Sequence, residues 1–242
     1  MKIKSLFAVT NVIIRMTNAI DVSLLQQKNL YKFIQQTHYD DNAILPLSQI
    51  LMVRLGYQSC FGPQGCQGCI PPSTIDRTST GLDHVIQDLY DGWKKRKDST
   101  DDIPDLSFAD YLNAACLKAV EDLTQDSTVR SYTTYGRQDC PEVAANDSPF
   151  FETFDPSIRA NPNLSWKHVY QKFHTENFQL TVKEIVALIG GGHSIGQISK
   201  NISGWPTGQW DDTPSKIDAR FFDVLVNLKW VRDNATNPDK PA

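Results

Sequence analysis

Apolar residues recur along most of this chain at the three- and four-residue spacing of an amphipathic helix, and no run alternates as a half-buried strand does. The helices that this spacing predicts cover residues 24–36, 47–58, 81–95, 111–123, 165–176, 181 to about 190, and 218–230. The connections between them are long and rich in Gly, Pro, Asp and Ser, above all 60–80 and 124–163. Loops of this length carry function or need staples in a compact helical protein. We therefore expect a mostly α fold with long, stapled loops.

The composition is that of a globular protein with its own core. Of the 242 residues, 40% are hydrophobic and 21% are charged, and the net charge is −4. This length can bury the core of one large domain or of two small lobes. The dense basic cluster at 94–97 is followed at once by acidic residues, so we expect no nucleic-acid partner. No stretch has the roughly 18 apolar residues of a membrane-spanning helix, so we expect no membrane span.

Three of the five cysteines, Cys60, Cys66 and Cys69, crowd into one Gly- and Pro-rich loop. Such crowding is typical of disulfides or of a zinc knuckle, and the lack of a nearby second pair of ligands favours disulfides. With an odd number of cysteines, one stays unpaired within the chain. We expect this to be Cys116, because it falls on an apolar helical pattern where a thiol packs as a small apolar side chain.

N-glycosylation sequons favour an oxidising, secretory route, and they occur at Asn146, Asn163, Asn201 and Asn234. The chain starts with basic residues and an apolar patch that polar residues interrupt. Residues 1–29 are thus a signal segment or an N-terminal extension, and residues 231–242 form a polar tail. We expect a secreted protein or one of the secretory pathway.

Motifs that belong together occur in this order: VRLGYQSC at 53–60, YGRQDC at 135–140, EIVALIGGGHSIG at 184–196 and IDARFF at 217–222. In combination they resemble the plant-type haem peroxidase superfamily, most closely its animal ascorbate-peroxidase-like members. The resemblance covers roughly 47–230 and implies a haem-peroxidase-like domain at 30–230, with two lobes of helices around a haem cleft. It also implies haem b as cofactor, and hydrogen peroxide and a small reductant as substrates.

His193 matches the proximal position of that family, where a helix-borne imidazole is the axial ligand of the haem iron. Gly192 and Ser194 flank it, and a glycine there lets a flat porphyrin approach the helix backbone because no Cβ stands in the way. The alternative is a core histidine packed in a glycine-rich bend. The segment is one residue longer than the family's usual spacing, so we expect either a bulge in the helix or a rotated upstream face.

Arg54 and Tyr57 match the distal arginine and the distal aromatic residue, and Gln58 occupies the position of the distal histidine. In the family, the histidine moves a proton between the peroxide oxygens while the arginine stabilises developing charge. The alternative for Arg54 is a solvated surface arginine. The amide of Gln58 cannot take up and release a proton near neutral pH. Because loss of a general base costs about 100- to 10,000-fold in rate, the resemblance predicts a degenerate distal site.

The calcium ligands and the candidate disulfides also depart from the family pattern. Ser59 and Gln67 replace the aspartate ligands of the distal calcium, so we expect no calcium there. The resemblance suggests that disulfides tie the loop down instead, and the candidate pairs are Cys60 with Cys66 and Cys69 with Cys140.

Two functions are compatible with these residues. The first is a haem-binding peroxidase-family protein with weak or lost activity. Its family places an aspartate behind the axial histidine, and that position falls after the last residue of this sequence, which predicts a C-terminally truncated domain or a histidine without this partner. The second is a non-catalytic secreted binding or matrix protein on the same scaffold, which the altered distal residues also favour.

Overall fold

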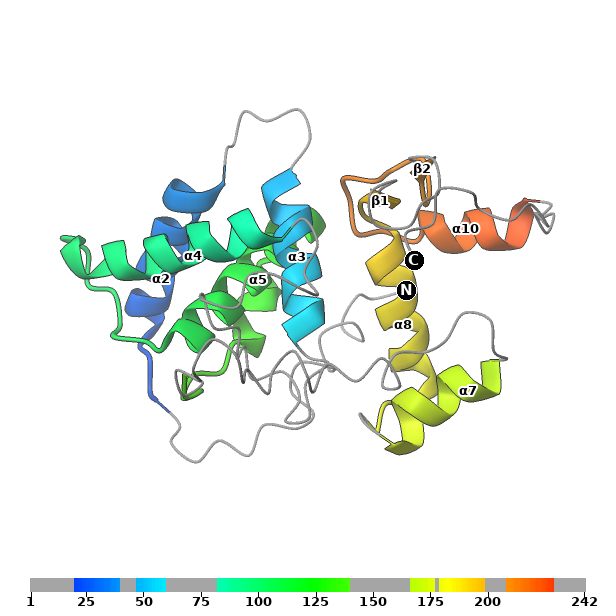
Figure 1. Cartoon of the computed structure of the whole chain (residues 1–242), viewed down its shortest axis with the longest axis horizontal. Helices are drawn as coiled ribbons and strands as arrows, with labels where there is room; N and C mark the ends of the chain where they lie inside the picture. Colours follow the sequence, from blue (N-terminus) through cyan, green and yellow to red (C-terminus); the bar gives the residue numbers. More distant parts are fainter. Residues whose placement is uncertain are drawn as a thin grey trace.

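The computed structural model describes residues 20–39, 47–59, 82–139, 166–176, 179–198 and 208–228, and all structural statements below concern them. Their α-helices are α2 (Leu24–His38), α3 (Leu47–Ser59), α4 (Asp83–Lys95), α5 (Phe108–Thr124), α7 (Trp166–Tyr170), α8 (Val182–His193) and α10 (Arg220–Asn227) (Figure 1). Shorter turns are η3 (Arg96–Asp98), η4 (Ser127–Tyr132) and the π-helical η5 (Gln171–Glu176). The predicted mostly α fold is confirmed. Within the described part of the chain, no helix is long and apolar enough to cross a membrane.

Two short strands, β1 (Gln197–Ile198) and β2 (Gly208–Gln209), pair antiparallel shortly after α8. Gly196 joins α8 to β1 with a φ of 76°, which is the left-handed region that glycine enters without strain. Strands of two residues are too short to show a period of two in the sequence, so the pattern did not predict them.

The helices begin where the sequence supplies caps. Ser23 before α2 and Thr181 before α8 each form a complete capping box with the residue three positions on. Ser107 accepts a hydrogen bond from the backbone N–H of Asp110 at 3.0 Å, and α5 therefore starts at Phe108, three residues before the predicted start at 111. Asp110 does not return the bond, because its carboxylate binds the loop at 136–137 instead.

The first group of helices packs around α5, which is buried along nearly its whole length. Its core joins α2, α3, α4 and α5 through large, fully buried side chains: Leu30, Ile34, Met52, Leu55, Ile86, Leu89, Tyr111 and Leu112. α3 and α5 approach closely at Gly56, where an added Cβ would lie 2.8 Å from Sγ of Cys116. Cys116 is a buried free thiol, as its place on an apolar face predicted. The other cysteines lie outside the described residues.

The second group of helices contains α7, η5, α8 and α10 (Figure 1). Phe173, Leu180 and Ile185 form its small core. The predicted helix at 165–176 exists, but its second half has π-helical hydrogen bonds. α8 and α10 touch at Gly190, where an added Cβ would lie 1.9 Å from Cζ of Phe222.

The two groups, which are the predicted two lobes, meet through a separate apolar cluster. Leu117, Val120 and Leu123 of α5 pack there against Ile195 and Ile217 of the second group. The backbone N–H of Ile217 also donates to the carbonyl oxygen of Leu123 at 3.3 Å. From α3, Ile50 and Val53 pack against the same cluster. This contact brings α3 next to the chain segment that directly follows His193.

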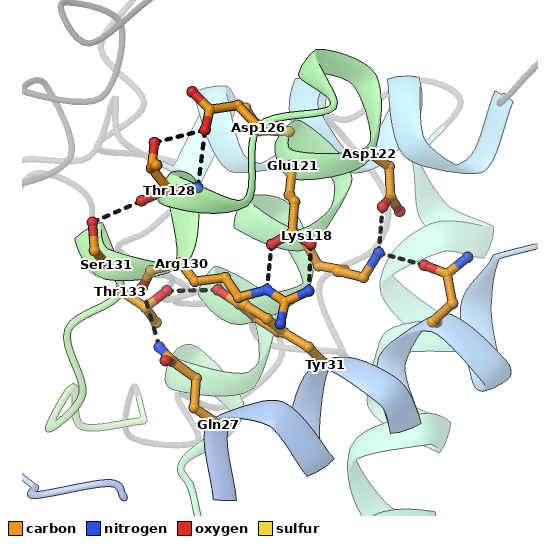
Figure 2. A network of polar contacts seen from close by, with 12 residues as sticks. Gln27, Tyr31, Lys118, Glu121, Asp122, Asp126, Thr128, Arg130, Ser131 and Thr133 are labelled. Carbon is orange, nitrogen blue, oxygen red and sulfur yellow. Dashed lines mark hydrogen bonds and ion pairs between the residues drawn. The ribbon is translucent and has the colours of Figure 1, made fainter. Parts of the chain in front are cut away.

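A polar network ties η4 to α2 and α5 (Figure 2). Arg130 binds both carboxylate oxygens of Glu121 at 2.5 Å. Lys118, which is buried, donates to Gln35 at 2.5 Å and pairs with Asp122. Because buried charges are costly unless they are paired and hydrogen-bonded, this network fixes how the three elements fit together.

Candidate functional site

His193 is the last residue of α8 and its side chain is half-buried. Its Nδ1 lies 2.7 Å from the carbonyl oxygen of Ile189, one turn earlier in the helix. A carbonyl oxygen only accepts hydrogen bonds, so Nδ1 carries a proton, and in this tautomer of the imidazole the lone pair is at Nε2. A free Nε2 lone pair is what an imidazole needs in order to bind a metal.

Two aromatic side chains from later in the sequence pack against the imidazole of His193. Phe221 of α10 stacks on it, with ring centroids 5.1 Å apart and an interplanar angle of 21°. Trp210 meets it edge to face, with centroids 4.7 Å apart. Together with the bond to Ile189, these contacts fix the ring orientation. The sequence motif included Phe221, but Trp210 was missed because it follows a long connection with no periodic pattern.

The glycines before His193 serve different purposes. Gly190 is needed because the ring of Phe222 occupies the space of its missing side chain. At Gly192, which is exposed, an added Cβ would meet no atom of the described chain within 4 Å. α8 is regular α-helix throughout these glycines and contains no bulge. A rotation of its upstream face relative to the family stays a prediction.

Ser194 closes the helix. It is fully buried, its backbone N–H donates to the carbonyl oxygen of Gly190 at 2.9 Å, and its hydroxyl donates to that of Gly191 at 3.0 Å. The Ser194 hydroxyl thus satisfies a backbone carbonyl at the end of α8, which helix ends otherwise leave unpaired.

The predicted distal residues all fall on α3. Arg54, Tyr57 and Gln58 are spaced by three and four positions, so the helix presents them on one face. Met52 and Leu55 on another face are buried in the first core. Arg54 is half-buried and Tyr57 is 38% exposed, whereas the side chain of Gln58 lies outside the described residues. Their roles stay a prediction.

An acidic turn follows Trp210 and was also missed from the sequence. Asp211 is buried, and its Oδ1 accepts a hydrogen bond from the backbone N–H of Thr213 at 2.8 Å. Its Oδ2 is buried and has no hydrogen-bond partner among the described residues. Burial, assisted by the charge of Asp218, raises the pKa of Asp211 above its ordinary value. A proton or a cation would satisfy the orphan oxygen, although the described residues show no group of three or more metal-ligating side chains.

The motif at 135–140 holds the first group of helices together. Arg137 pairs with Asp110 of α5 at 3.0 Å, and both side chains are almost completely buried. Asp139 accepts a hydrogen bond from the backbone N–H of Ala109 at 3.0 Å, in the first turn of the same helix. A carboxylate at a helix N-terminus satisfies an otherwise unpaired donor. The motif thus positions α5, on which α3 packs.

In the described part of this helical protein, an oriented imidazole lies at a helix end beside aromatic rings, and an imidazole is one of the side chains that hold haem iron. The peroxidase family model matches residues 30–232, which is most of the chain. The chain therefore belongs to the peroxidase family. No curated protein gives a significant match.

Haem is the cofactor that this family uses, and the residues around His193 fit it. The imidazole is a suitable donor for iron, and its tautomer leaves the lone pair at Nε2. The backbone at Gly192 is open on the side where a Cβ would stand. Family membership supports a haem-peroxidase type of function, with hydrogen peroxide and a reductant as substrates.

Proposed function

We propose that this protein binds haem b through Nε2 of His193 and that its reaction with hydrogen peroxide is impaired because Gln58 stands in place of a general base. The observation that carries the proposal is the hydrogen bond from Nδ1 of His193 to the carbonyl oxygen of Ile189. A histidine packed only as a core residue would be expected to satisfy both ring nitrogens. Among the described residues, Nδ1 of His193 has a hydrogen-bond partner and Nε2 has none, so this proposal assigns Nε2 to the ligand.

Bound haem supplies the iron at which the oxygen–oxygen bond of hydrogen peroxide is reduced. On the proximal side, the carbonyl of Ile189 holds the proton at Nδ1 and increases the donor strength of Nε2, although less than a carboxylate would. Phe221 and Trp210 pack against the ring and hold its orientation. Gly192 completes the cofactor contact in this proposal, whereas the buried Ser194 supports the end of the helix that carries His193.

On the other face, Arg54 stabilises negative charge on the leaving oxygen. Gln58 orients peroxide by hydrogen bonds but leaves the proton where it is, and Tyr57 borders the pocket. The proposed protein is therefore a weak oxidant of small reductants. Two further parts of the proposal are a loop held by Cys60–Cys66 and Cys69–Cys140 disulfides in place of a distal calcium, and a secretory location, which the sequons support.

Addition of hemin to the purified full chain tests the ligand. We expect a Soret band in the wild type and its loss or displacement in His193→Ala. His174→Ala is a matched control, because Nδ1 of His174 also lies against a backbone carbonyl, that of Leu180, at 2.6 Å. An unchanged spectrum in His193→Ala would refute the ligand assignment. A wild type that takes up no hemin would support the alternative, a non-catalytic binding or matrix protein.

A further inference from the structure

The buried tyrosines of the first group of helices differ in what faces their hydroxyl groups. The hydroxyl of Tyr39 donates to the carbonyl oxygen of Ala115 at 2.7 Å, and that of Tyr31 lies 2.6 Å from the hydroxyl oxygen of Thr133. The hydroxyl of Tyr111 instead lies 2.8 Å from Nε2 of His38. In this comparison, only Tyr111 faces a base that titrates near neutral pH.

The direction of each hydrogen bond follows from the next partner. Nδ1 of His38 lies 2.7 Å from Oδ2 of Asp88, and a carboxylate only accepts, so Nδ1 carries the proton. Nε2 of the neutral ring is therefore an acceptor, and the phenol of Tyr111 donates to it. The result is a directed chain from phenol to imidazole to carboxylate, contributed by α5, α2 and α4.

This chain leads from the core to solvent. Tyr111 is 0% exposed and the side chain of His38 is also fully buried, whereas the side chain of Asp88 is 58% exposed. Burial lowers the pKa of His38, which keeps its ring neutral and able to accept a proton. Burial raises the pKa of Tyr111, so the phenol does not ionise by itself. The phenol of Tyr111 can still react by losing its proton and an electron together, that is, by oxidation to a neutral radical.

We infer that Tyr111 is a redox-active tyrosine that stores an oxidising equivalent as a neutral radical, with His38 as its proton acceptor and Asp88 as the counter-charge. The inference rests on the proposed function for its oxidant, because hydrogen peroxide supplies the oxidising equivalents when it is reduced to water.

The O–H bond of Tyr111 breaks, the proton moves to Nε2 of His38, and the electron goes to hydrogen peroxide together with a second electron from the small reductant. Hydrogen peroxide takes up these two electrons and two protons from solvent, its oxygen–oxygen bond breaks, and two molecules of water form. The imidazolium of His38 then faces the carboxylate of Asp88 as an ion pair. When a small reductant returns an electron to Tyr111, the proton returns from His38 to the phenolic oxygen.

The packing around His38 is shaped for this contact. Gly92 of α4 lies so close that an added Cβ would be 2.4 Å from the imidazole ring and 3.0 Å from the hydroxyl oxygen of Tyr111. The neighbouring cation Arg96 is paired with Asp105 at 2.8 Å and donates to the carbonyl of Leu106 at 2.6 Å, which limits its repulsion of a charged His38. A phenol that needed only a hydrogen-bond acceptor could use a backbone carbonyl, as Tyr39 does.

The test is freeze-quench electron paramagnetic resonance of the hemin-loaded full chain after mixing with hydrogen peroxide, with deuterated tyrosine to identify the radical. We expect a tyrosyl signal that disappears in Tyr111→Phe and persists in Tyr39→Phe, which removes a hydroxyl that is equally buried. In His38→Gln the signal should form at least ~100-fold more slowly, which is the usual cost of losing a general base. A signal that Tyr111→Phe leaves unchanged overturns the inference.

Asp88→Asn keeps the test decisive if substitutions at His38 prevent folding, since Asp88 is exposed. The Tyr111 radical of this variant should decay faster because the imidazolium has lost its counter-charge. An unchanged radical lifetime counts against the proposed proton transfer from Tyr111 to His38.

A second experiment oxidises the unloaded chain with photogenerated tris(bipyridine)ruthenium(III). Oxidation of Tyr111 there should be slower in D₂O, and the slowing should vanish in His38→Gln.

The peroxide experiment and the ruthenium experiment together distinguish failure of the proposed function from failure of this inference. If hemin does not bind, the proposed function fails, and the ruthenium experiment alone decides whether Tyr111 has its proton acceptor. If hemin binds and peroxide is consumed without a Tyr111 radical, the proposed function stands and this inference fails.

Discussion

His38 and His193 are both held at Nδ1, yet they differ in what Nε2 meets. His38 lies in the first group of helices, where Nδ1 faces a carboxylate and Nε2 accepts from a buried phenol. His193 ends a helix of the second group, where Nδ1 is fixed by a carbonyl and aromatic rings cover the ring face. The first histidine is arranged to exchange a proton, and the second is arranged to donate a lone pair.

The glycines near these histidines show the same difference. Gly92 is filled by the imidazole of His38, so the protein itself occupies the space of its missing side chain. At Gly192 no atom of the described residues lies within 4 Å of an added Cβ. Gly92 therefore serves packing, whereas Gly192 has room for a side chain among the described residues.

The largest expected effect concerns the distal site on α3, where we propose that Gln58 stands in place of an imidazole base. Gln58→His restores an imidazole on the face of α3 that carries Arg54. Peroxidase turnover of the hemin-loaded protein should rise by about 100-fold or more. Steady-state oxidation of a small phenol measures it, with Gln49→His, a substitution in the first turn of the same helix, as control. No gain would mean that a further part of the distal site is disabled.

A second prediction concerns packing at His38. Gly92→Ala places a methyl group 2.4 Å from ring atoms that are held on both sides. Overpacking of this kind costs about 1–3 kcal/mol in the free energy of unfolding. Urea unfolding of the unloaded chain provides the measurement. Wild-type stability in this variant would show that the ring moves aside easily, and the proton chain would then not be rigid.

The pH dependence of stability tests the burial of His38. Burial lowers the pKa of His38 below its ordinary value of 6.5, so the unfolded chain binds a proton there that the folded chain excludes. Stability should therefore fall as the pH drops below that value, by at most about 1.4 kcal/mol per pH unit for this group. Thermal unfolding between about pH 8 and pH 5 measures the slope. His38→Gln should flatten this slope, and a slope that His38→Gln leaves unchanged would contradict the assignment.

Local signals in the sequence predicted the helices well. The spacing of Leu30 and Ile34 and the Ser107 cap each act within one helix, so the predicted and observed bounds of α2 and α5 agree within a few residues. The sequence left open whether the glycines before His193 form a bulge, and the structure shows that α8 stays regular there.

Contacts between distant segments could not be predicted in the same way. Trp210 and Asp211 directly follow β2, which pairs with β1 just after His193, and no periodicity in the sequence signals that pairing. The chain from Tyr111 to Asp88 joins three helices, so each residue taken alone has an ordinary helical pattern. The candidate ligand was found because a motif of contiguous residues carries it, whereas its surroundings depend on tertiary packing.

The smallest expected effect tests whether the open glycine serves a cofactor. Gly192→Ala meets no described atom within 4 Å, and alanine is the better helix former. Since Gly192 lies in the last turn of α8, the unloaded chain should gain about 0.5 kcal/mol, less than the full difference in helix propensity. Hemin affinity should fall, because a methyl group now stands where a porphyrin would approach the backbone. Paired hemin titrations and urea unfolding, with Lys183→Ala on the exposed first turn as control, measure both quantities. Greater stability with unchanged hemin affinity would show that haem does not approach this face of α8, and the comparison between the two histidines would then rest on Nε2 alone.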